Sequence, residues 1–135
     1  MPRLPVVRDH MDRHVAMLRP EMDILDAVGV LLENHVTGAP VVDRSGRLVG
    51  ILTEKDCLRL VAAGIEGKVP RGSVANFMTP NPETIPPDMD VYYAAGLFLT
   101  RDFRRFPVVE DGKLVGTITR FDILRAIQAN LSLAG

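Results

Sequence analysis

The sequence predicts an α+β fold made of two copies of one unit, in which a helix, two short strands and a second helix follow one another. Three observations predict this. A segment that starts at Pro20 returns at Pro87, and Pro-Val-Val occurs at both 40–42 and 107–109. Each copy has apolar residues at the spacing of an amphipathic helix, followed by two apolar runs with a turn between them. This order of elements, with small sheets, is typical of α+β proteins.

The repeat covers most of the chain. Both matches above have a separation of 67 residues (107 minus 40), and Met11 matches Met78 at the same separation. Beyond the first turn the separation falls to 66, because Asp43–Gly46 is one residue longer than Glu110–Gly112. Turns tolerate such deletions, so the change does not weaken the match. A repeat of this length is stronger evidence for the fold than any single predicted helix or strand.

The first helix of each copy begins behind an aspartate. Asp23 and Asp90 are good N-caps, because a carboxylate there accepts a hydrogen bond from a free amide of the first turn. Apolar residues then fall at i, i+3, i+4, i+7 and i+8. They are Ile24, Ala27, Val28, Leu31 and Leu32 in the first copy, and Val91, Ala94, Ala95, Phe98 and Leu99 in the second. We expect two amphipathic helices, each with one buried stripe.

Two strands follow each of these helices. The short apolar runs at 40–42 and 107–109 precede a turn, and the longer runs at 48–53 and 114–119 end in threonine. Asp111-Gly112 is a strong signal for a tight hairpin turn. We therefore expect one β-hairpin in each copy.

A second helix is expected after each hairpin, from Glu54 to about 63 and from Arg120 to about 129. The segment 64–72 is rich in glycine and charge and is typical of a linker. We therefore divide the chain into a first repeat at 1–68, which includes an N-terminal leading segment, and a second repeat at 69–135, which includes the linker.

Composition limits the class of protein. The 135 residues are 47% hydrophobic, enough to bury the core of a compact domain without disulfides or metals. The 16 basic and 17 acidic residues give a formal charge of -1, which leaves no excess positive field to hold a nucleic acid. With Cys57 as its only cysteine, and with neither a membrane span nor a secretory signal, the chain is expected in the cytoplasm.

Two segments resemble a known family. One runs from Gly38-Ala-Pro-Val-Val-Asp43 through Gly46-Arg-Leu-Val-Gly-Ile-Leu-Thr-Glu-Lys-Asp56, and the other from Phe106-Pro-Val-Val-Glu110 through Gly112-Lys-Leu-Val-Gly-Thr-Ile-Thr-Arg-Phe-Asp122. Both resemble the central signature of a CBS (cystathionine β-synthase) domain. Phe77-Met-Thr-Pro-Asn-Pro82 is similar to the start of many second copies, so the resemblance extends from about Asp9 to Ala129.

The resemblance implies two βαββα repeats packed as a pseudo-twofold pair, a module that often dimerises into a flat disc. It also implies that an adenine nucleotide (AMP, ADP or ATP) binds in clefts between the copies as a regulatory ligand, with no metal required. The chain contains no second domain to control, so we expect the regulated target to be another, unidentified protein or the homodimer itself. The choice among AMP, ATP, NAD and S-adenosylmethionine stays open, because all contain adenosine.

The sharpest chemical feature is a Thr-x-x-Asp pair in each copy, Thr53 with Asp56 and Thr119 with Asp122, where a strand is expected to end and a helix to begin. Free amides at a helix start suit a phosphate, and a carboxylate there can accept both hydroxyls of a ribose. The alternative is a capping box between threonine and aspartate, which needs no ligand. The two roles can coexist, because the hydroxyl can cap the helix while the carboxylate turns to the ribose.

In the family, the stretch that leads into the first strand of each copy lines the adenine pocket. Here these stretches are Gly38, Ala39 and Pro40, and Arg105, Phe106 and Pro107. Gly38 permits close backbone approach, and Phe106 offers a ring for stacking on the base. The alternative is that both prolines only mark the start of a strand.

Two arginines distinguish the second copy. Arg104 and Arg105 could clamp phosphates bidentately, whereas the first copy has Thr37-Gly38 at the matching places. On this ground the second copy has the better phosphate site. The alternative is a solvated basic edge without a ligand.

Other positions around the expected pockets agree less well with the family. Thr84 and Ile85, like Leu18-Arg19 in the first copy, are expected to form extended strands that wall the opposite side of a pocket. Family members often carry serine or threonine immediately before the ribose aspartate, where this chain has Lys55 and Phe121. These departures remove one possible hydroxyl contact with the ligand in each copy.

Three functions follow from these residues. The first is a regulatory sensor of adenine nucleotides, and the alternative is a ligand-free module that only builds a homodimer or binds another protein. Catalysis is disfavoured, because we find no glycine-rich phosphate loop, no strong metal site and no Ser/His/Asp arrangement. His10 and His14 have a metal-compatible spacing, but they lie in the leading segment that Met11 aligns with Met78.

Overall fold

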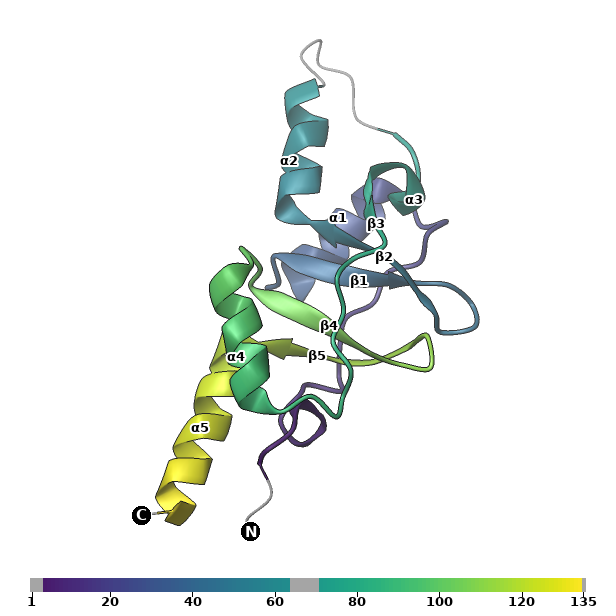
Figure 1. Ribbon diagram of the computed structural model, residues 1–135. Coiled ribbons are helices and arrows are strands. Elements are labelled where there is room, and N and C mark those ends of the chain that lie inside the picture. Colours follow the sequence, from purple (N-terminus) through teal and green to yellow (C-terminus); the bar gives the residue numbers. More distant parts are fainter. Residues whose placement is uncertain (1–3, 64–70, 135) are drawn as a thin grey trace. The chain divides into compact units, whose positions relative to one another are not determined.

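The structure is a computed structural model that describes residues 4–63 and 71–134 (Figure 1). It separates into two compact units, which we describe one at a time. The central unit contains the chain from Val15 to Pro82. The terminal unit combines the chain up to His14 with the chain from Glu83 onward. Each unit has helices and a small antiparallel sheet, so the predicted α+β class is confirmed.

The central unit contains a three-stranded antiparallel sheet in the order β1-β2-β3. Its elements are α1 (Ile24–Glu33), β1 (Gly38–Val42), β2 (Leu48–Thr53), α2 (Glu54–Ala63), α3 (Val74–Phe77) and β3 (Thr79–Pro80). Two of its strands are the predicted hairpin, and β3 comes from the chain that follows the linker. The helix, strand, strand and helix predicted for the first copy are therefore all present.

The terminal unit repeats this arrangement with a two-stranded antiparallel sheet. Its elements are the 3₁₀ helix η1 (Val7–Asp9), α4 (Val91–Thr100), β4 (Arg105–Glu110), β5 (Lys113–Thr119) and α5 (Arg120–Ala134). The predicted tight turn joins β4 to β5, with both Asp111 (φ 54°) and Gly112 (φ 79°) in the left-handed region. None of the helices within the described ranges is long and apolar enough to cross a membrane.

The predicted N-caps are confirmed, and the predicted apolar stripes are too wide. The Leu25 amide donates to the Asp23 carboxylate at 3.3 Å, and the Tyr93 amide donates to Asp90 at 2.8 Å. The last stripe members, Leu32 and Leu99, are instead exposed. At 100° per residue, position i+8 lies about 80° from the first residue of the stripe, which is its edge.

We call residues 4–14 and 71–82 the leading segments of the first and second repeats; each packs in the unit built around the other repeat. The Val7 amide donates to the Met89 carbonyl at 2.8 Å, and the Val74 amide donates to the Met22 carbonyl at the same distance. Residues 4–14, which we assigned to the first repeat, therefore belong to the compact unit of the second. The compact units thus differ from the two sequence repeats, and the expected boundary at 68/69 lies outside the described residues.

Each leading segment thus packs in the unit of the other repeat, which we call the exchange of leading segments. Two glycines make it possible. A Cβ atom on Gly116 would lie 2.7 Å from the Asp12 carbonyl oxygen and 2.9 Å from the Met11 sulfur. A Cβ atom on Gly50 would lie 2.5 Å from the Met78 sulfur. The methionines that align in the repeat therefore pack against glycines that also align, and glycine is needed because the neighbouring backbone approaches so closely.

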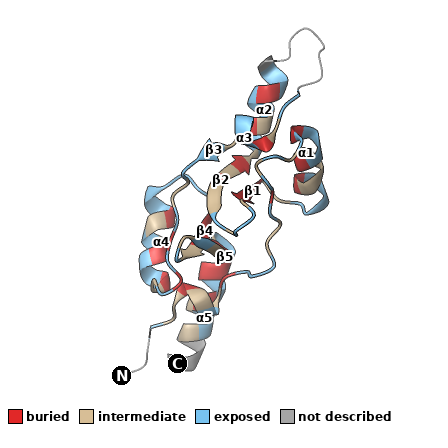
Figure 2. Cartoon of the chain, turned by 90° about the vertical axis from the view of Figure 1, so that its right-hand side faces the viewer, coloured by how far each residue is buried: buried red, intermediate tan, exposed pale blue. Residues whose placement is uncertain are grey.

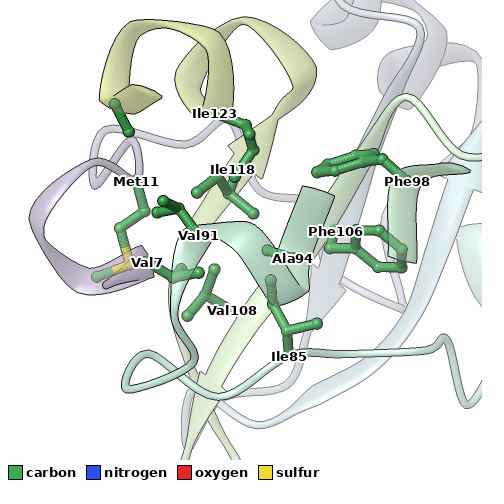
Figure 3. Packing of buried hydrophobic residues seen from close by; sticks show 11 residues of the cluster. Val7, Met11, Ile85, Val91, Ala94, Phe98, Phe106, Val108, Ile118 and Ile123 are labelled. Atoms are coloured by element: carbon green, nitrogen blue, oxygen red, sulfur yellow. The ribbon is translucent and has the colours of Figure 1, made fainter. Parts of the chain in front are cut away.

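Each unit has its own apolar core. Figure 2 shows that α1 and α4 bury one side and expose the other, and that buried residues concentrate on the strands. In the terminal unit, Val7 and Met11 of the leading segment lie beside Val91 and Ile118 (Figure 3). Burying these apolar side chains stabilises the unit and fixes the ends of β5 and α5 where the candidate site lies.

Candidate functional site

The first candidate site lies in the central unit where β2 ends and α2 begins; we call it the Asp56 corner (Gly38, Thr53, Asp56, Arg59 and Thr79). The Thr53 amide donates to Asp56 Oδ2 at 2.9 Å, and the Asp56 amide donates to Thr53 Oγ1 at 3.3 Å. This is the reciprocal capping box that the sequence offered as one alternative. It stabilises the first turn of α2 and fixes the carboxylate at the strand-to-helix junction.

The other carboxylate oxygen of Asp56 has two further donors. Arg59 Nη1 lies 3.3 Å from Asp56 Oδ1, and Thr79 Oγ1 lies 3.5 Å from the same atom. The Asp56 side chain is only 4% exposed, whereas that of Arg59 is 75% exposed. A buried carboxylate is thus held by one residue of its own helix and by one residue of the exchanged leading segment.

The second candidate site is the equivalent junction of β5 and α5 in the terminal unit; we call it the Asp122 corner (Asp12, Arg105, Thr119, Asp122 and Arg125). The Thr119 amide donates to Asp122 Oδ2 at 2.9 Å, and the Asp122 amide donates to Thr119 Oγ1 at 3.2 Å. Arg125 Nη2 donates to Asp122 Oδ1. The side chain of Asp122 is 10% exposed and that of Arg125 is 67% exposed, so capping and ion pairing are the same in both corners.

The two corners differ at the residue that faces the threonine across the hairpin. That residue is Gly38 opposite Thr53 and Arg105 opposite Thr119. Arg105 is half-buried, and its buried Nε has no hydrogen-bond partner among the described residues. Burial lowers the pKa of the Arg105 guanidinium, while the charges of the nearby carboxylates of Asp122 and Asp12 act in the opposite direction.

The leading segments contribute different groups to the two corners. Asp12 aligns with Thr79 in the repeat and pairs with Thr117 of β5, its amide donating to the Thr117 carbonyl at 2.8 Å. Thr79 instead brings a neutral hydroxyl to Asp56. The Asp122 corner therefore contains one cation and one anion more than the Asp56 corner, although each corner is formally neutral.

Phe106 does not lie where the stacking prediction requires. Its side chain is 0% exposed, and its ring lies beside Phe98 (Figure 3), with the ring centroids 4.8 Å apart and edge-on. The ring of Phe103 also packs edge-on against it, at 5.4 Å. A ring enclosed in this way has no free face for an adenine base. The alternation of a strand turns Phe106 into the core and its neighbour Arg105 away from it, which corrects our interpretation of this residue.

Backbone hydrogen bonds join the two predicted prolines to the extended segments beside them. Pro40 and Pro107 are buried within β1 and β4, and their carbonyls accept from the Leu18 amide at 2.9 Å and the Ile85 amide at 3.1 Å. Ile85 is buried in the terminal core. The prolines therefore lie inside strands, and their two carbonyls are used in backbone hydrogen bonds to the neighbouring extended segments.

The remaining predicted residues divide into buried and exposed sets. Gly38 and Ala39 are buried in β1, whereas Thr84 and Arg104 are exposed. The residues that break the family pattern, Lys55 and Phe121, are exposed on the first turns of α2 and α5. The structure thus brings each threonine together with its aspartate, and it places Arg105 beside Asp122.

Sequence reasoning did not identify Arg59, Arg125, Asp12 or Thr79. A signal existed for the first two, because Arg59 and Arg125 have the same 66-residue separation as Asp56 and Asp122. Nothing in the sequence indicated the other two, since their role follows from the exchange of leading segments.

An apolar groove lies between α4 and α5 of the terminal unit. Its volume is about 740 Å³, and Phe98, Leu99, Ile123, Leu124 and Ile127 contribute to its lining. Leu99 is 88% exposed, and Leu124 is also exposed. None of the residues predicted for ligand binding lines this groove.

Metal and thiol chemistry have little support in the part of the chain that the structure describes. Within residues 4–63 and 71–134, no three His, Cys, Asp or Glu side chains gather as metal ligands would. Cys57 is half-buried, and burial raises the pKa of its thiol, which disfavours the reactive thiolate.

Comparison with known proteins identifies the pattern of both repeats. The family model of the CBS domain matches residues 3–63 and 74–129. The CBS domain-containing protein YhcV of Bacillus subtilis is 32% identical over 118 residues, which is 87% of this chain and 81% of YhcV. The A-adding tRNA nucleotidyltransferase of Aquifex aeolicus is 35% identical over 125 residues, which is 93% of this chain and only 15% of that protein. The chain also spans 59% of chloroplastic CBSX1 of Arabidopsis thaliana, to which it is 31% identical.

Solved structures share the fold over nearly the whole chain. The crystal structure of CBSX2 of Arabidopsis thaliana in complex with AMP has a TM-score of 0.82 and 34% identity, covering 93% of this chain and 98% of that one. The CBS domain pair of protein MJ0100, solved with 5′-methylthioadenosine and S-adenosyl-L-methionine, has a TM-score of 0.79 and 26% identity. That match covers 95% of this chain and 99% of the other.

Proposed function

This chain belongs to the CBS domain family, and on that premise we propose that it is a regulatory module that binds an adenine nucleotide, AMP or ATP, at its two Thr-x-x-Asp corners. The observation that carries the proposal is a buried carboxylate at the same strand-to-helix junction in each unit, with one oxygen used by the cap and the other facing a solvent-exposed arginine. A partner protein would respond to the bound nucleotide.

The carboxylates have the chemistry that a ribose requires. The capping amides of Thr53 and Thr119 occupy the Oδ2 atoms of the two aspartates. An ionised carboxylate offers about four acceptor positions, so without its arginine Oδ1 of Asp122 can take the two O–H donors of a 2′,3′-diol, whereas Oδ1 of Asp56 also accepts from Thr79 and has one position left. Because the side chains are 4% and 10% exposed, a hydrogen bond formed there is shielded from competing water.

The Asp122 corner also has the chemistry that a phosphate requires. The buried Arg105 Nε lacks a partner among the described residues, and a phosphate oxygen would satisfy it. Exposed Arg104 precedes it in the chain and adds a second cation. The amides of the first turn of α5 add a partial positive charge. We therefore expect the Asp122 corner to prefer phosphorylated ligands.

The relatives support an adenosine-containing ligand. CBSX2 was crystallised with AMP, and the MJ0100 domain pair with two other adenosyl compounds. All three compounds carry a ribose diol, which is the group that the corners of this chain suit best. The base pocket stays without an assigned stacking residue, since Phe106 is buried.

Calorimetric titration with AMP, ATP, adenosine and S-adenosylmethionine tests the proposal. Asp122→Asn and Asp56→Asn keep an oxygen for the capping amide but lose the charge. We expect each to weaken nucleotide binding at its own corner by about 10- to 100-fold, the value of a charge-assisted hydrogen bond. Wild-type protein that binds none of the four compounds, or variants that bind them unchanged, would overturn the proposal.

A second candidate function is homodimerisation without a ligand, which the apolar groove between α4 and α5 favours. Leu99 and Leu124 expose apolar surface there that a second copy would cover. Sedimentation of Leu99→Asp and Leu124→Asp should show a monomer where the wild type is a dimer. Leu4→Asp, a change at an exposed leucine outside the groove, is the matched control. A monomeric wild type would exclude this function.

A further inference from the structure

Neither capping nor ligand binding explains the ion pair that lies at each corner. Arg59 donates to Oδ1 of Asp56, and Arg125 donates to Oδ1 of Asp122. In both cases the arginine lies three residues after the aspartate on the same helix and contacts the oxygen that the cap leaves over. The arrangement is the same in both units although the residue after the aspartate is Cys57 in one and Ile123 in the other.

Burial within each pair is strongly asymmetric. The aspartate side chains are 4% and 10% exposed, and the arginine side chains are 75% and 67% exposed. A carboxylate at this depth needs a donor at all times, because burying an unpaired charge is costly. A solvent-exposed guanidinium loses little by returning to water, since such pairs are weak and screened by salt. The carboxylate therefore needs a partner, but that partner can be replaced.

We propose that Arg59 and Arg125 are exchangeable counter-ions, each of which holds Oδ1 of its aspartate in the empty corner and releases it to the ribose diol. This inference rests on the function proposed above. At Asp122 the diol supplies two O–H donors to the atom that the guanidinium leaves, and at Asp56 one diol hydroxyl shares that atom with the Thr79 hydroxyl, so each carboxylate stays hydrogen-bonded throughout. The arginines thus compete with the ligand and raise the nucleotide concentration at which each corner fills.

Competition predicts that removing the arginines strengthens binding. If each pair is formed for about four-fifths of the time in the empty protein, its loss raises the affinity for a diol about fivefold, which is about 1 kcal/mol at 1.4 kcal/mol per factor of ten. A guanidinium that instead positions the carboxylate or contacts the ligand predicts the opposite sign. The direction of the change therefore distinguishes the two roles.

The experiment is a titration of the full chain with adenosine, which has the diol and no phosphate, and with 2′,3′-dideoxyadenosine, which lacks the diol. The test variant is Arg59→Gln/Arg125→Gln. The control is Arg44→Gln/Lys113→Gln, which removes the same charge from exposed positions at the hairpin turns. Lys113 begins β5, six residues and about 20 Å of extended strand from Thr119.

We expect the test variant to bind adenosine about fivefold more tightly than the wild type and to bind dideoxyadenosine unchanged. The control variant should match the wild type with both compounds. Arg59→Lys/Arg125→Lys, which restores a competing cation, should bring adenosine affinity back toward the wild-type value.

The salt dependence of adenosine binding is a second test, because an arginine with a purely structural role would not change it. Between 0.05 and 0.5 M NaCl the screening length falls from roughly 14 to 4 Å, so salt weakens the exposed ion pairs. Adenosine should therefore bind the wild type more tightly at the higher salt concentration. The affinity of the glutamine variant for adenosine should not change with salt in this way. Wild-type protein that binds none of AMP, ATP, adenosine and S-adenosylmethionine would refute the proposed function itself, and wild-type protein that binds AMP but no adenosine would refute the counter-ion role. Wild-type protein that binds adenosine, with glutamine variants that bind it equally or more weakly, would refute only the counter-ion role.

Discussion

The Asp56 corner and the Asp122 corner have the same capping box and the same aspartate–arginine pair, but they differ in the two residues that flank them. Gly38 and Thr79 leave the Asp56 corner with small, neutral neighbours, whereas Arg105 and Asp12 add a pair of opposite charges to the Asp122 corner. The helix start thus fixes what the two repeats have in common. The facing strand and the exchanged leading segment supply what can differ, so each corner can acquire its own ligand preference without loss of its cap.

We expect the largest effect at the residue that follows Gly38 or Arg105 in the chain. It is Ala39 in the central unit and Phe106 in the terminal unit. Phe106→Ala removes a fully buried ring that packs against two other rings, so we expect the free energy of unfolding to fall by about 3–5 kcal/mol. Urea denaturation measures the change. Phe103→Ala, at a partly exposed ring, should cost less, and equal losses for the two variants would contradict the assigned burial.

The exchanged leading segments provide the next comparison. Gly116→Ala places a methyl group 2.7 Å from the backbone oxygen of Asp12, which cannot move away, so we expect a destabilisation of about 2–3 kcal/mol. Gly50→Ala places it 2.5 Å from the flexible side chain of Met78 and should cost less, about 1–2 kcal/mol. Thermal denaturation of both variants checks the order. A larger loss at Gly50 would show that the leading segments are held differently.

The assignment of phosphate to the Asp122 corner depends on Arg105. Arg105→Gly gives this corner the residue of the Asp56 corner, and we expect AMP binding to weaken about tenfold, or about 1.4 kcal/mol, because a charge-assisted hydrogen bond is lost. Adenosine, without a phosphate, should bind nearly as before. Calorimetry with both ligands measures the difference, and an equal loss for both would make Arg105 a structural residue.

The smallest effect concerns the two hairpin turns. Hydrogen bonds from the Ser45 hydroxyl and the Arg47 amide lower the pKa of Asp43, whereas the other turn depends on the left-handed residues Asp111 and Gly112. A lowered pKa stabilises the fold above the unfolded-state value and is lost as pH falls through the folded value. The small stability advantage of the wild type over Asp43→Asn at pH 6 should therefore shrink as the pH falls below the ordinary aspartate value of 3.8, as measured by thermal melting. An advantage that stays constant from pH 6 to pH 2 would mean that the charge does not matter.

Local sequence signals predicted the elements and the caps correctly. Asp23 and Asp90, the hairpin turn at Asp111-Gly112 and the Thr-x-x-Asp boxes depend on contacts within four residues, and all lie where the sequence placed them. Arg59 and Arg125 belong to the same class, since a pairing three residues along a helix follows from helix geometry. They could have been found by comparing the repeats position by position.

Contacts between distant segments were not predictable in this way. The stacking role assigned to Phe106 was wrong because the resemblance placed the residue near a pocket, whereas strand alternation directs its ring into the core. Asp12 and Thr79 were missed because a leading segment has no local signal that indicates which sheet it joins. That choice depends on close packing against Gly116 and Gly50, at least 28 residues away in the chain in each case.

Local sequence patterns were enough to predict the duplicated α+β architecture, the order of its elements and the position of a capped carboxylate at each strand-to-helix junction. Those features depend on periodicity, turn chemistry and capping, which act over a few residues. Long-range contacts select which leading segment completes which sheet, and therefore which side chains surround each carboxylate. They do so because close packing and the pairing of backbone amides choose among distant partners, and a linear pattern does not encode that choice.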